Sequence, residues 1–202
     1  MTPPLPLVER KQRQARQRII EAARELFLER GFDGVSVGDI AERAEVGRTT
    51  FFRHFGDKQE VVFANEQELL DTIAAAGQAD AAPAPRDATE ALEQLRTVML
   101  ALCAQATADP DAYTRHFQLI EQHSELRGRD AVKMQQVADK LSELLIHRGS
   151  DEATARLAAQ IALACYQTAK RLGNNPRTLV DDTQAAFSRA LTLGTGAAET
   201  RA

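Results

Sequence analysis

The sequence is poor in cysteine and aromatic residues and has no long apolar stretch. It contains two cysteines and no tryptophan, and aromatic side chains make up 5% of its 202 residues. The cysteines, Cys103 and Cys165, are too few for a disulfide framework and lack the spacing of metal ligands. No run of 18 or more uncharged apolar residues occurs, and residues 1–18 lack the apolar core of a secretory signal. We therefore expect a cytoplasmic protein with no membrane span and no metal site.

Catalytic motifs are missing as well. None of the four histidines lies in an HxxxH or HExxH pattern, and no glycine-rich phosphate loop occurs. A nucleophile with its base, or a pair of carboxylates, is not found in a defined motif either. We therefore predict that the chain is not an enzyme, has no catalytic residues and needs no cofactor.

Apolar residues recur at intervals of three and four along nearly the whole chain. This period is typical of amphipathic helices, and the alternating β-branched runs of strands are absent. Hydrophobic residues make up 44% and charged residues 27% of the sequence, as in ordinary globular proteins. These features predict an all-α fold of about nine helices, at roughly residues 11–30, 36–44, 48–55, 57–76, 87–108, 110–123, 126–147, 151–172 and 176–193.

Interruptions of this periodicity predict the domain organisation. Two prolines and several small residues break it at Gly77–Arg86, which we expect to be a loop. The end of the chain is rich in glycine, alanine and threonine, which favours a frayed tail. The predicted parts are an N-terminal domain at 1–56, a connecting helix at 57–76, a larger helical domain at 77–194 and the tail at 195–202.

Positive charge is concentrated near one end of an acidic protein. The formal net charge is −4, but residues 9–18 (ERKQRQARQR) hold five basic side chains and one acidic one. Residues 1–60 balance at +1 and residues 61–202 at −5. Such a local excess favours a polyanionic partner at that end, whereas a solvated helix start is the simpler alternative for a charge run alone.

Two short predicted helices, joined by the three-residue turn Glu45-Val46-Gly47, follow a longer one. This order is typical of a helix-turn-helix module. Ser36 and Asp39 have the spacing of a capping pair at the start of the first short helix. Five of the eight phenylalanines lie between positions 27 and 55, where a small core needs large side chains. The outward face of the second short helix then carries groups that bond phosphate oxygens or base edges, namely Arg48, Thr49, Thr50, Arg53 and His54.

The segment Ser36–Ala64 (SVGDIAERAEVGRTTFFRHFGDKQEVVFA) resembles the DNA-binding domain of the TetR family of bacterial transcriptional regulators. That family has a Ser or Thr cap, Ile-Ala, Ala-Gly-Val, a Thr-aromatic-Tyr stretch, His-Phe, and Lys at the start of the fourth helix. The resemblance covers about residues 11–65, and the all-helical remainder has the family's usual size. The matching positions are Ser36, Ile40-Ala41, Ala44-Glu45-Val46, Thr50-Phe51-Phe52, His54-Phe55 and Lys58.

Two positions depart from the family pattern. Glu45 stands where the family has glycine in the turn, and a left-handed backbone there costs a non-glycine residue about 1 kcal/mol. Phe52 replaces a tyrosine, so the hydroxyl that bonds a phosphate is missing. We expect one phosphate hydrogen bond fewer and no loss of DNA binding.

The resemblance implies a role for each matching position in binding double-stranded operator DNA. Contacts to phosphates hold the protein on the duplex, and contacts to base edges select the sequence. Basic residues of the first helix are expected near the minor groove or on flanking phosphates. The implied phosphate contacts are Ser36, Thr50, His54 and Lys58, with Phe52 on the same surface; the implied base contacts are Arg48, Thr49 and Arg53; and the arm consists of Arg10, Lys11, Arg13 and Arg16.

The resemblance also implies a homodimer. One such module reads few base pairs, so two subunits on a palindromic operator are expected, with half-sites about one helical turn or a multiple of it apart. The family's last two long helices usually form a four-helix bundle between subunits, here at about 151–172 and 177–193. An alanine-rich stripe on the first of them suits such close packing, and it suits a helix buried within one chain equally well. The expected dimer residues are Leu157, Ile161, Ala162, Cys165, Ala169 and Phe187.

Members of the family are released from DNA by a small molecule that binds inside the C-terminal bundle. Apolar stripes on the middle helices imply a mainly apolar site here. The segment 115–130 resembles regulators with acyl-CoA-like ligand domains, which favours a lipophilic effector. The candidate lining residues are Met99, Cys103, His116, Phe117, His123, Met134, Tyr166 and Lys170.

Two other functions stay open beside ligand-responsive repression. Cys103 and Cys165 lie on long predicted helices that can be neighbours, as in a redox sensor, although buried inert cysteines show the same pattern. The second open function is that of an interaction protein with this fold, which uses DNA only as a scaffold. We interpret the chain as a repressor, and the same contacts activate if the operator lies upstream of a promoter.

Overall fold

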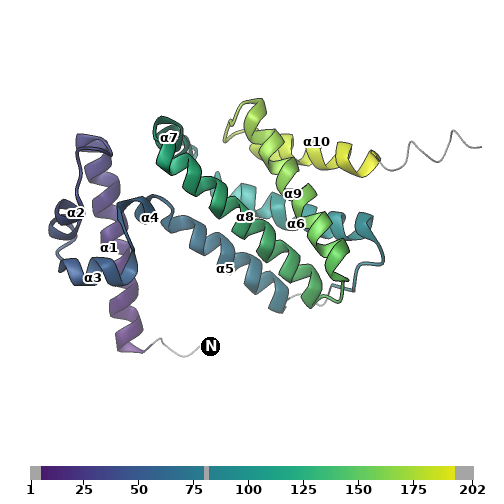
Figure 1. Cartoon of the computed structure of the whole chain (residues 1–202), viewed down its shortest axis with the longest axis horizontal. Helices are drawn as coiled ribbons and strands as arrows, with labels where there is room; N and C mark the ends of the chain where they lie inside the picture. The colour runs from purple at the N-terminus through teal and green to yellow at the C-terminus, as the bar shows by residue number, and fades with distance from the viewer. Residues whose placement is uncertain (1–5, 80–81, 194–202) are drawn as a thin grey trace, which may run out of the picture. The chain divides into compact units, whose positions relative to one another are not determined.

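The computed structural model describes residues 6–79 and 82–193, apart from the side chains of residues 67–68 and 75–79. Within these ranges the regular secondary structure is entirely helical, which confirms the predicted all-α class (Figure 1). Ten helices are described, one more than the sequence predicts. They are α1 (Leu7–Arg30), α2 (Val37–Arg43), α3 (Arg48–His54), α4 (Lys58–Val62), α5 (Ala64–Ala79), α6 (Ala88–Ala106), α7 (Pro110–Gln122), α8 (Ser124–His147), α9 (Glu152–Leu172) and α10 (Leu179–Thr192).

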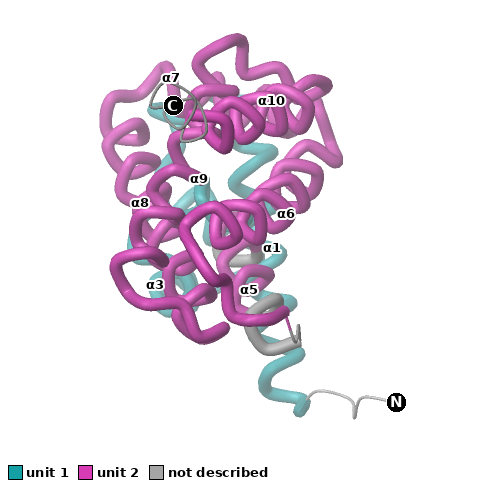
Figure 2. The backbone as a smooth tube through the Cα atoms, turned by 90° about the vertical axis from the view of Figure 1, so that its right-hand side faces the viewer, with its two compact units in different colours: residues 1–65 teal, residues 66–202 magenta. Residues whose placement is uncertain are grey.

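The chain folds into two compact units, which Figure 2 colours teal and magenta. Unit 1 is residues 1–65 and unit 2 is residues 66–202. The division falls inside the segment 57–76, which the sequence predicts to connect two domains. Each unit has an apolar core of its own.

Unit 1 is built around α1, which packs against α2, α3 and α4. The inner face of α1 is apolar at intervals of three and four residues, so that Ile19, Ala23 and Leu26 are all buried. Ile40 of α2 and Phe51 of α3 complete this core with no exposed surface. The core therefore sets the position of the two short helices relative to α1.

In unit 2, helix α9 is central and packs against α6, α8 and α10. Its inner face consists largely of alanine, and small side chains allow neighbouring helices to approach closely. Leu141 of α8 and Phe187 of α10 are fully buried in the same core. The buried alanines of α9 are Ala155, Ala158, Ala159, Ala162 and Ala169.

The prediction of one helix over 57–76 is wrong. The helix stops at Val62, and a new one begins at Ala64 and continues to Ala79, beyond the expected end. Phe63, between them, leaves the helical conformation and buries its side chain. The carbonyl of Ala64 accepts a hydrogen bond of 2.7 Å from Arg16 of α1. Local periodicity did not indicate this break, because its stabilising contacts lie on another helix.

Most predicted helix starts are confirmed by their caps. Ser36 and Asp39 form a capping box, in which each side chain accepts a hydrogen bond from the other residue's backbone N–H. Asp57 and Asp87 cap α4 and α6, and Pro110 occupies the first turn of α7. Asp151, the predicted first residue of the helix at 151–172, is instead its cap, because its side chain accepts a hydrogen bond from the backbone N–H of Thr154 and α9 begins at Glu152. The predicted tail at 195–202 lies outside the described residues.

Glu45 has the left-handed backbone that its position in the turn implies, with a φ of 52°. Its side chain is exposed, and the Glu45–Arg18 ion pair is long, at 4.0 Å. Replacing Glu45 by glycine removes the steric strain at Cβ and raises the conformational entropy of the unfolded chain. Because the strain is the larger effect, we expect the free energy of unfolding of unit 1 to rise by about 0.5–1 kcal/mol. Urea unfolding followed by far-UV circular dichroism measures this change.

Glu42→Gly is the matched control for this substitution. Glu42 is also exposed, but it lies inside α2 with helical geometry. The backbone at position 42 is not strained, so glycine relieves nothing there. We expect this substitution to lower the free energy of unfolding by about 1 kcal/mol. A loss of stability in both variants would contradict the assignment of strain to Glu45.

Candidate nucleic-acid interface

Helix α3 has one buried and one exposed face. Phe51 and Phe55 are 0% and 5% exposed and point into the core, whereas the intervening Phe52 is 55% exposed. The exposed face is cationic and polar, and α3 carries no acidic residue. Most of the predicted DNA contacts are exposed, namely Arg10, Lys11, Arg13, Ser36, Arg48, Thr49, Phe52 and Arg53, whereas Arg16, Thr50, His54 and Lys58 are half-buried.

The start of α2 and the start of α3 lie close together. A Cβ atom placed on Gly38 of α2 lies 2.7 Å from the guanidinium Nη2 of Arg48 and 3.4 Å from the hydroxyl of Ser36. Two predicted contact residues, Ser36 and Arg48, therefore lie beside the same glycine. The absence of a side chain at Gly38 leaves room for the Arg48 guanidinium at this point.

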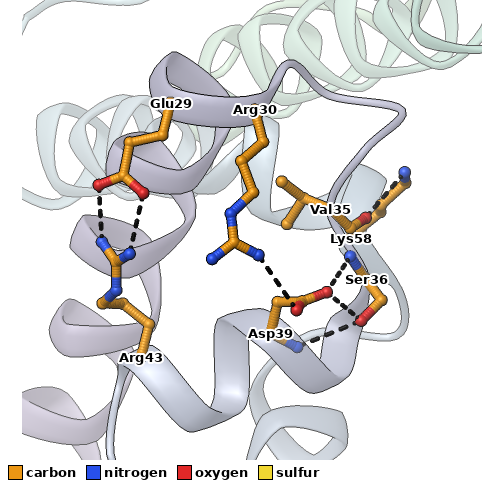
Figure 3. A network of polar contacts seen from close by, with 7 residues as sticks. All are labelled: Glu29, Arg30, Val35, Ser36, Asp39, Arg43 and Lys58. Atoms are coloured by element: carbon orange, nitrogen blue, oxygen red, sulfur yellow. Dashed lines mark hydrogen bonds and ion pairs between the residues drawn. The ribbon is translucent and has the colours of Figure 1, made fainter.

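Ion pairs hold α2 against α1, as Figure 3 shows. Arg43 of α2 makes two parallel hydrogen bonds to the carboxylate of Glu29, at 3.0 and 2.9 Å, and a third to Glu25 at 3.1 Å. Arg30 pairs with Asp39 at 3.4 Å. Hydrogen bonds from Arg43 lower the pKa of Glu29, and those from Ser36 lower the pKa of Asp39. Both carboxylates are thus ionised at neutral pH, and their charges are compensated by arginine.

This network was not predicted from the sequence. Arg43 is separated from its partners on α1 by 14 and 18 residues, so no helical spacing indicates the pairs. Arg30 and Arg43 are occupied in holding unit 1 together. The positive charge of the outward face of α3 comes from Arg48 and Arg53.

Lys58, at the start of α4, is bonded within unit 1 (Figure 3). Its ammonium donates to the backbone carbonyls of Phe32, at 2.9 Å, and Val35, at 3.1 Å. It also lies 4.3 Å from the centre of the Phe32 ring. An ammonium has three N–H donors, so two of them hold the loop between α1 and α2 and one is left for a phosphate. The phosphate contact stays a prediction.

Arg16 and His54 are also engaged within unit 1. Besides its bond to Ala64, the Arg16 guanidinium lies 5.3 Å from the centre of the Phe55 ring. Burial lowers the pKa of His54, and the positive charges of Arg16 and Arg53 lower it further. His54 is thus neutral at neutral pH, so a contact to phosphate would be a hydrogen bond without a charge.

Several predicted effector residues come together in unit 2. The ammonium of Lys170 lies 3.9 Å from the centre of the Phe117 ring and 5.6 Å from that of Tyr166. His116 contacts Phe117 edge-on, at 5.0 Å between ring centres. The structure adds two residues that the sequence analysis missed: Tyr113, one turn before Phe117, and Asp130, which pairs with Lys170 at 3.5 Å.

Of the other predicted effector residues, Met99 and Met134 belong to the main core of unit 2, and His123 is half-buried between α7 and α8. Met99 is buried in this core and Met134 packs against it. Cys103 is buried, and its sulfur lies 3.7 Å from the hydroxyl of Thr183. A surface groove of about 490 Å³ between α8 and α9 is lined by none of the predicted effector residues.

The predicted dimer residues divide into two groups. Ala162, Cys165, Ala169 and Phe187 are at most 5% exposed and pack inside unit 2. Leu157 is 55% exposed, and Ile161 is half-buried. The stripe that the sequence analysis assigned to an interface is thus largely part of the chain's own core, and Leu157 and Ile161 are the members that reach the surface.

Unit 1 therefore has the architecture of a helix-turn-helix DNA-binding domain. Residues 19–64 match the family described as bacterial regulatory proteins, tetR family. Unit 1 is thus similar to the DNA-binding domain of that family, and the family match does not extend into unit 2.

Relatives named as regulators match chiefly over this domain. The chain is 49% identical over 55 residues to the transcriptional regulator TcmR of Streptomyces glaucescens, which is 27% of this chain and 24% of TcmR. It is 27% identical over 139 residues to the transcriptional repressor AcnR of Corynebacterium efficiens, which is 65% of this chain and 73% of AcnR. The chain thus spans about a quarter of the length of TcmR, and the match to it concerns the domain alone.

Solved structures show the same fold over most of the chain. A complex of SmeT with triclosan has a TM-score of 0.58 at 20% identity and covers 88% of this chain and 90% of that one. The repressor FadR of Thermus thermophilus, solved with lauroyl-CoA, has a TM-score of 0.54 at 22% identity and covers 89% and 94%. In the described part of this chain, no helix combines the length and apolarity of a membrane span.

Proposed function

We propose that the chain is a transcriptional repressor in the cytoplasm that binds a palindromic operator as a homodimer and is released by a small lipophilic effector. The observation that carries this proposal is the two-sided helix α3. Its inner face is held in the core by Phe51 and Phe55, and its outer face presents Arg48 and Arg53 without a neighbouring acid on the helix. A rigid cationic helix of this kind suits the major groove.

Within this proposal the residues of unit 1 divide between two tasks. Arg48, Thr49 and Arg53 read base edges, because their side chains are exposed on α3. Phosphates are bound by the starts of α1, α2 and α4 and by two residues of α3. The proposed phosphate contacts are Ser36, Thr50, His54, Lys58, Arg10, Lys11, Arg13 and Arg16, and Phe52 adds an apolar contact.

A stripe of mainly apolar residues on α9, of which Ile161 is half-buried and the others are exposed, supports the proposed dimer. It runs along the helix at intervals of three and four, opposite the buried alanines. Exposed apolar surface of this kind marks interaction sites in proteins of this size. The stripe consists of Leu157, Ile161, Ala164, Thr168 and Leu172.

The aromatic group of unit 2 supports the proposed effector site. The rings of Phe117 and Tyr166 and the ammonium of Lys170 meet there, and Tyr166 also packs against the main core of the unit. The similar structures of SmeT and FadR were solved with triclosan and lauroyl-CoA, both of which have large apolar parts. We propose that a lipophilic molecule binds in the same unit of this chain.

The first test measures binding to the DNA that flanks the chain's own gene, by fluorescence anisotropy over a salt series, with random DNA as the control. We expect saturable binding at two or four subunits per site, at least a thousandfold tighter than to random DNA. Equal, weak binding to both would contradict a specific regulator and favour the interaction protein.

Two variants test the division between base and phosphate contacts. Arg48→Ala is expected to relax the sequence preference, because a bidentate base contact is lost. Lys58→Ala is expected to weaken binding to all sequences alike and to reduce the slope of log K against log salt by about one unit. Circular dichroism controls for the loss of the Lys58 bonds to Phe32 and Val35. An equal loss on every sequence for both variants would contradict the division.

The redox alternative finds no support in the environment of the thiols. Cys103 and Cys165 are both buried and unbridged. Burial raises the pKa of each thiol above its ordinary value. Since the thiolate is the reactive form, both cysteines are disfavoured as sensors.

A further inference from the structure

Asp130 and Lys170 form a half-satisfied ion pair inside unit 2. The side chains are each 17% exposed, and the ammonium lies 3.5 Å from the carboxylate Oδ2. The second oxygen, Oδ1, is shielded from water, and no described residue donates a hydrogen bond to it. A shielded carboxylate oxygen without a donor is unfavourable, so this position is suited to a ligand that brings a donor or a positive charge.

Aromatic rings surround the ammonium of the same pair. The faces of Phe117 and Tyr166 lie 3.9 and 5.6 Å from Nζ of Lys170, which is the geometry of a cation–π contact. Tyr113 packs against Phe117 at 4.5 Å between ring centres, and its hydroxyl donates to Asn174 at 2.6 Å. The rings are therefore held in place by contacts other than those to Lys170.

The charge balance at this position favours a cation over an anion. The carboxylates of Asp130, Glu121 and Glu66 all act on Lys170, yet burial has the larger effect and lowers the pKa of the ammonium. Lys170 is thus a poorly hydrated cation that feels the negative charges of three acidic side chains. An anionic head group would bond Lys170 but would leave the Asp130 carboxylate beside a second negative charge.

We propose that this group of residues is the receptor for an organic cation, in which Asp130, Phe117 and Tyr166 bind the ligand and its charged group displaces the ammonium of Lys170. This inference rests on the proposed function, because it gives the lipophilic effector a positive charge. Lys170 stands in the last turn of α9, and its four-carbon side chain can carry the ammonium outward to water.

Three probes of matched size or opposite charge test the proposal with the full-length wild-type protein. They are phenyltrimethylammonium, its uncharged isostere tert-butylbenzene, and laurate, each measured by isothermal titration calorimetry. We expect the cation to bind at least tenfold more tightly than its isostere. Equal affinity for the two would overturn the proposal in favour of a purely apolar site. Absence of any binding of the cation would overturn it too.

Variants identify the residues that bind the probe. Asp130→Asn is expected to weaken binding of phenyltrimethylammonium at least tenfold, and Lys170→Met to strengthen it about tenfold, because the competing ammonium is gone. The matched controls are Asp139→Asn and Lys140→Met on α8, an exposed and a half-buried position, which should change the affinity less than twofold. Laurate binding that is lost in Lys170→Met would overturn the proposal, because it identifies Lys170 as the ligand's partner. If a variant does not fold, the comparison of the three probes on the wild-type protein decides the question.

A parallel measurement of operator binding separates this inference from the proposed function. If the protein binds its operator but not the cation, the inference alone fails. If the cation binds through Asp130 but no operator is found, the proposed repressor function fails and the proposed cation site remains supported. We expect phenyltrimethylammonium to weaken operator binding by the wild-type protein. Its effect on operator binding by Asp130→Asn should be less than a tenth as large.

Discussion

Replacing Phe51 by alanine is expected to unfold unit 1 and to abolish operator binding. Phe51 has no exposed surface and packs against Phe55 at 5.9 Å between ring centres. Truncation of a buried phenylalanine typically costs about 3–5 kcal/mol, as lost burial plus the cavity left behind. A unit of this size has a total stability of only a few kcal/mol, so the loss removes most of it.

The tyrosine content allows the two units to be followed separately. The chain has two tyrosines and no tryptophan, and both tyrosines, Tyr113 and Tyr166, lie in unit 2. In the Phe51→Ala variant, the helical far-UV circular dichroism signal of unit 1 should be lost already at low urea concentration. The tyrosine fluorescence transition should keep its midpoint.

Phe52→Ala is the control, since it removes the same ring from the neighbouring position. Phe52 is 55% exposed, so its loss should change the stability by less than about 0.5 kcal/mol. Operator affinity is expected to change only a few-fold, because this side chain has no hydroxyl to bond a phosphate. Equal destabilisation by the two variants would contradict the assignment of inner and outer faces to α3.

The second large effect is expected for Leu157→Glu, which should convert the proposed dimer to a monomer. Leu157 is 55% exposed and lies on the apolar stripe of α9. In a twofold interface the substitution buries a carboxylate in each subunit without a partner. Analytical ultracentrifugation should give the monomer mass of 22.2 kDa in place of twice that value. Because the second half-site is then bound independently, operator affinity should fall about a hundredfold or more.

Val132→Glu is the matched control for the dimer. Val132 is 59% exposed on α8, so the substitution introduces the same charge at a similarly exposed apolar position of unit 2. We expect the mass and the operator affinity of this variant to equal those of wild type. A Leu157→Glu protein that remains dimeric would place the interface elsewhere, and a monomeric one with full operator affinity would contradict the need for a dimer.

Features that depend on neighbours within four residues were predictable. In the capping pair, the side chains of Ser36 and Asp39 bond backbone N–H groups three residues apart. The N–H of Glu45 bonds the carbonyl of Glu42, and the first turn of α7 accepts Pro110 because it needs no N–H donor at that position. The same applies to the buried and exposed faces of α3, because helical spacing places Phe51 and Phe55 on one side. These interactions need no information from the rest of the chain, so the all-α class and the helix-turn-helix order could be inferred directly.

Features that depend on distant partners were decided by the tertiary structure. Arg16 bonds a carbonyl 48 residues away, and Lys58 bonds two carbonyls that are 26 and 23 residues away, although both resembled free cations in the sequence. The alanine-rich stripe of α9 suited an interface and a core equally, and packing against α6, α8 and α10 made it largely a core. Asp130 gave no local signal, because its partner Lys170 lies on the next helix. Spacing along one helix specifies which side chains share a face, but burial, pairing and loss of hydration depend on what packs against that face.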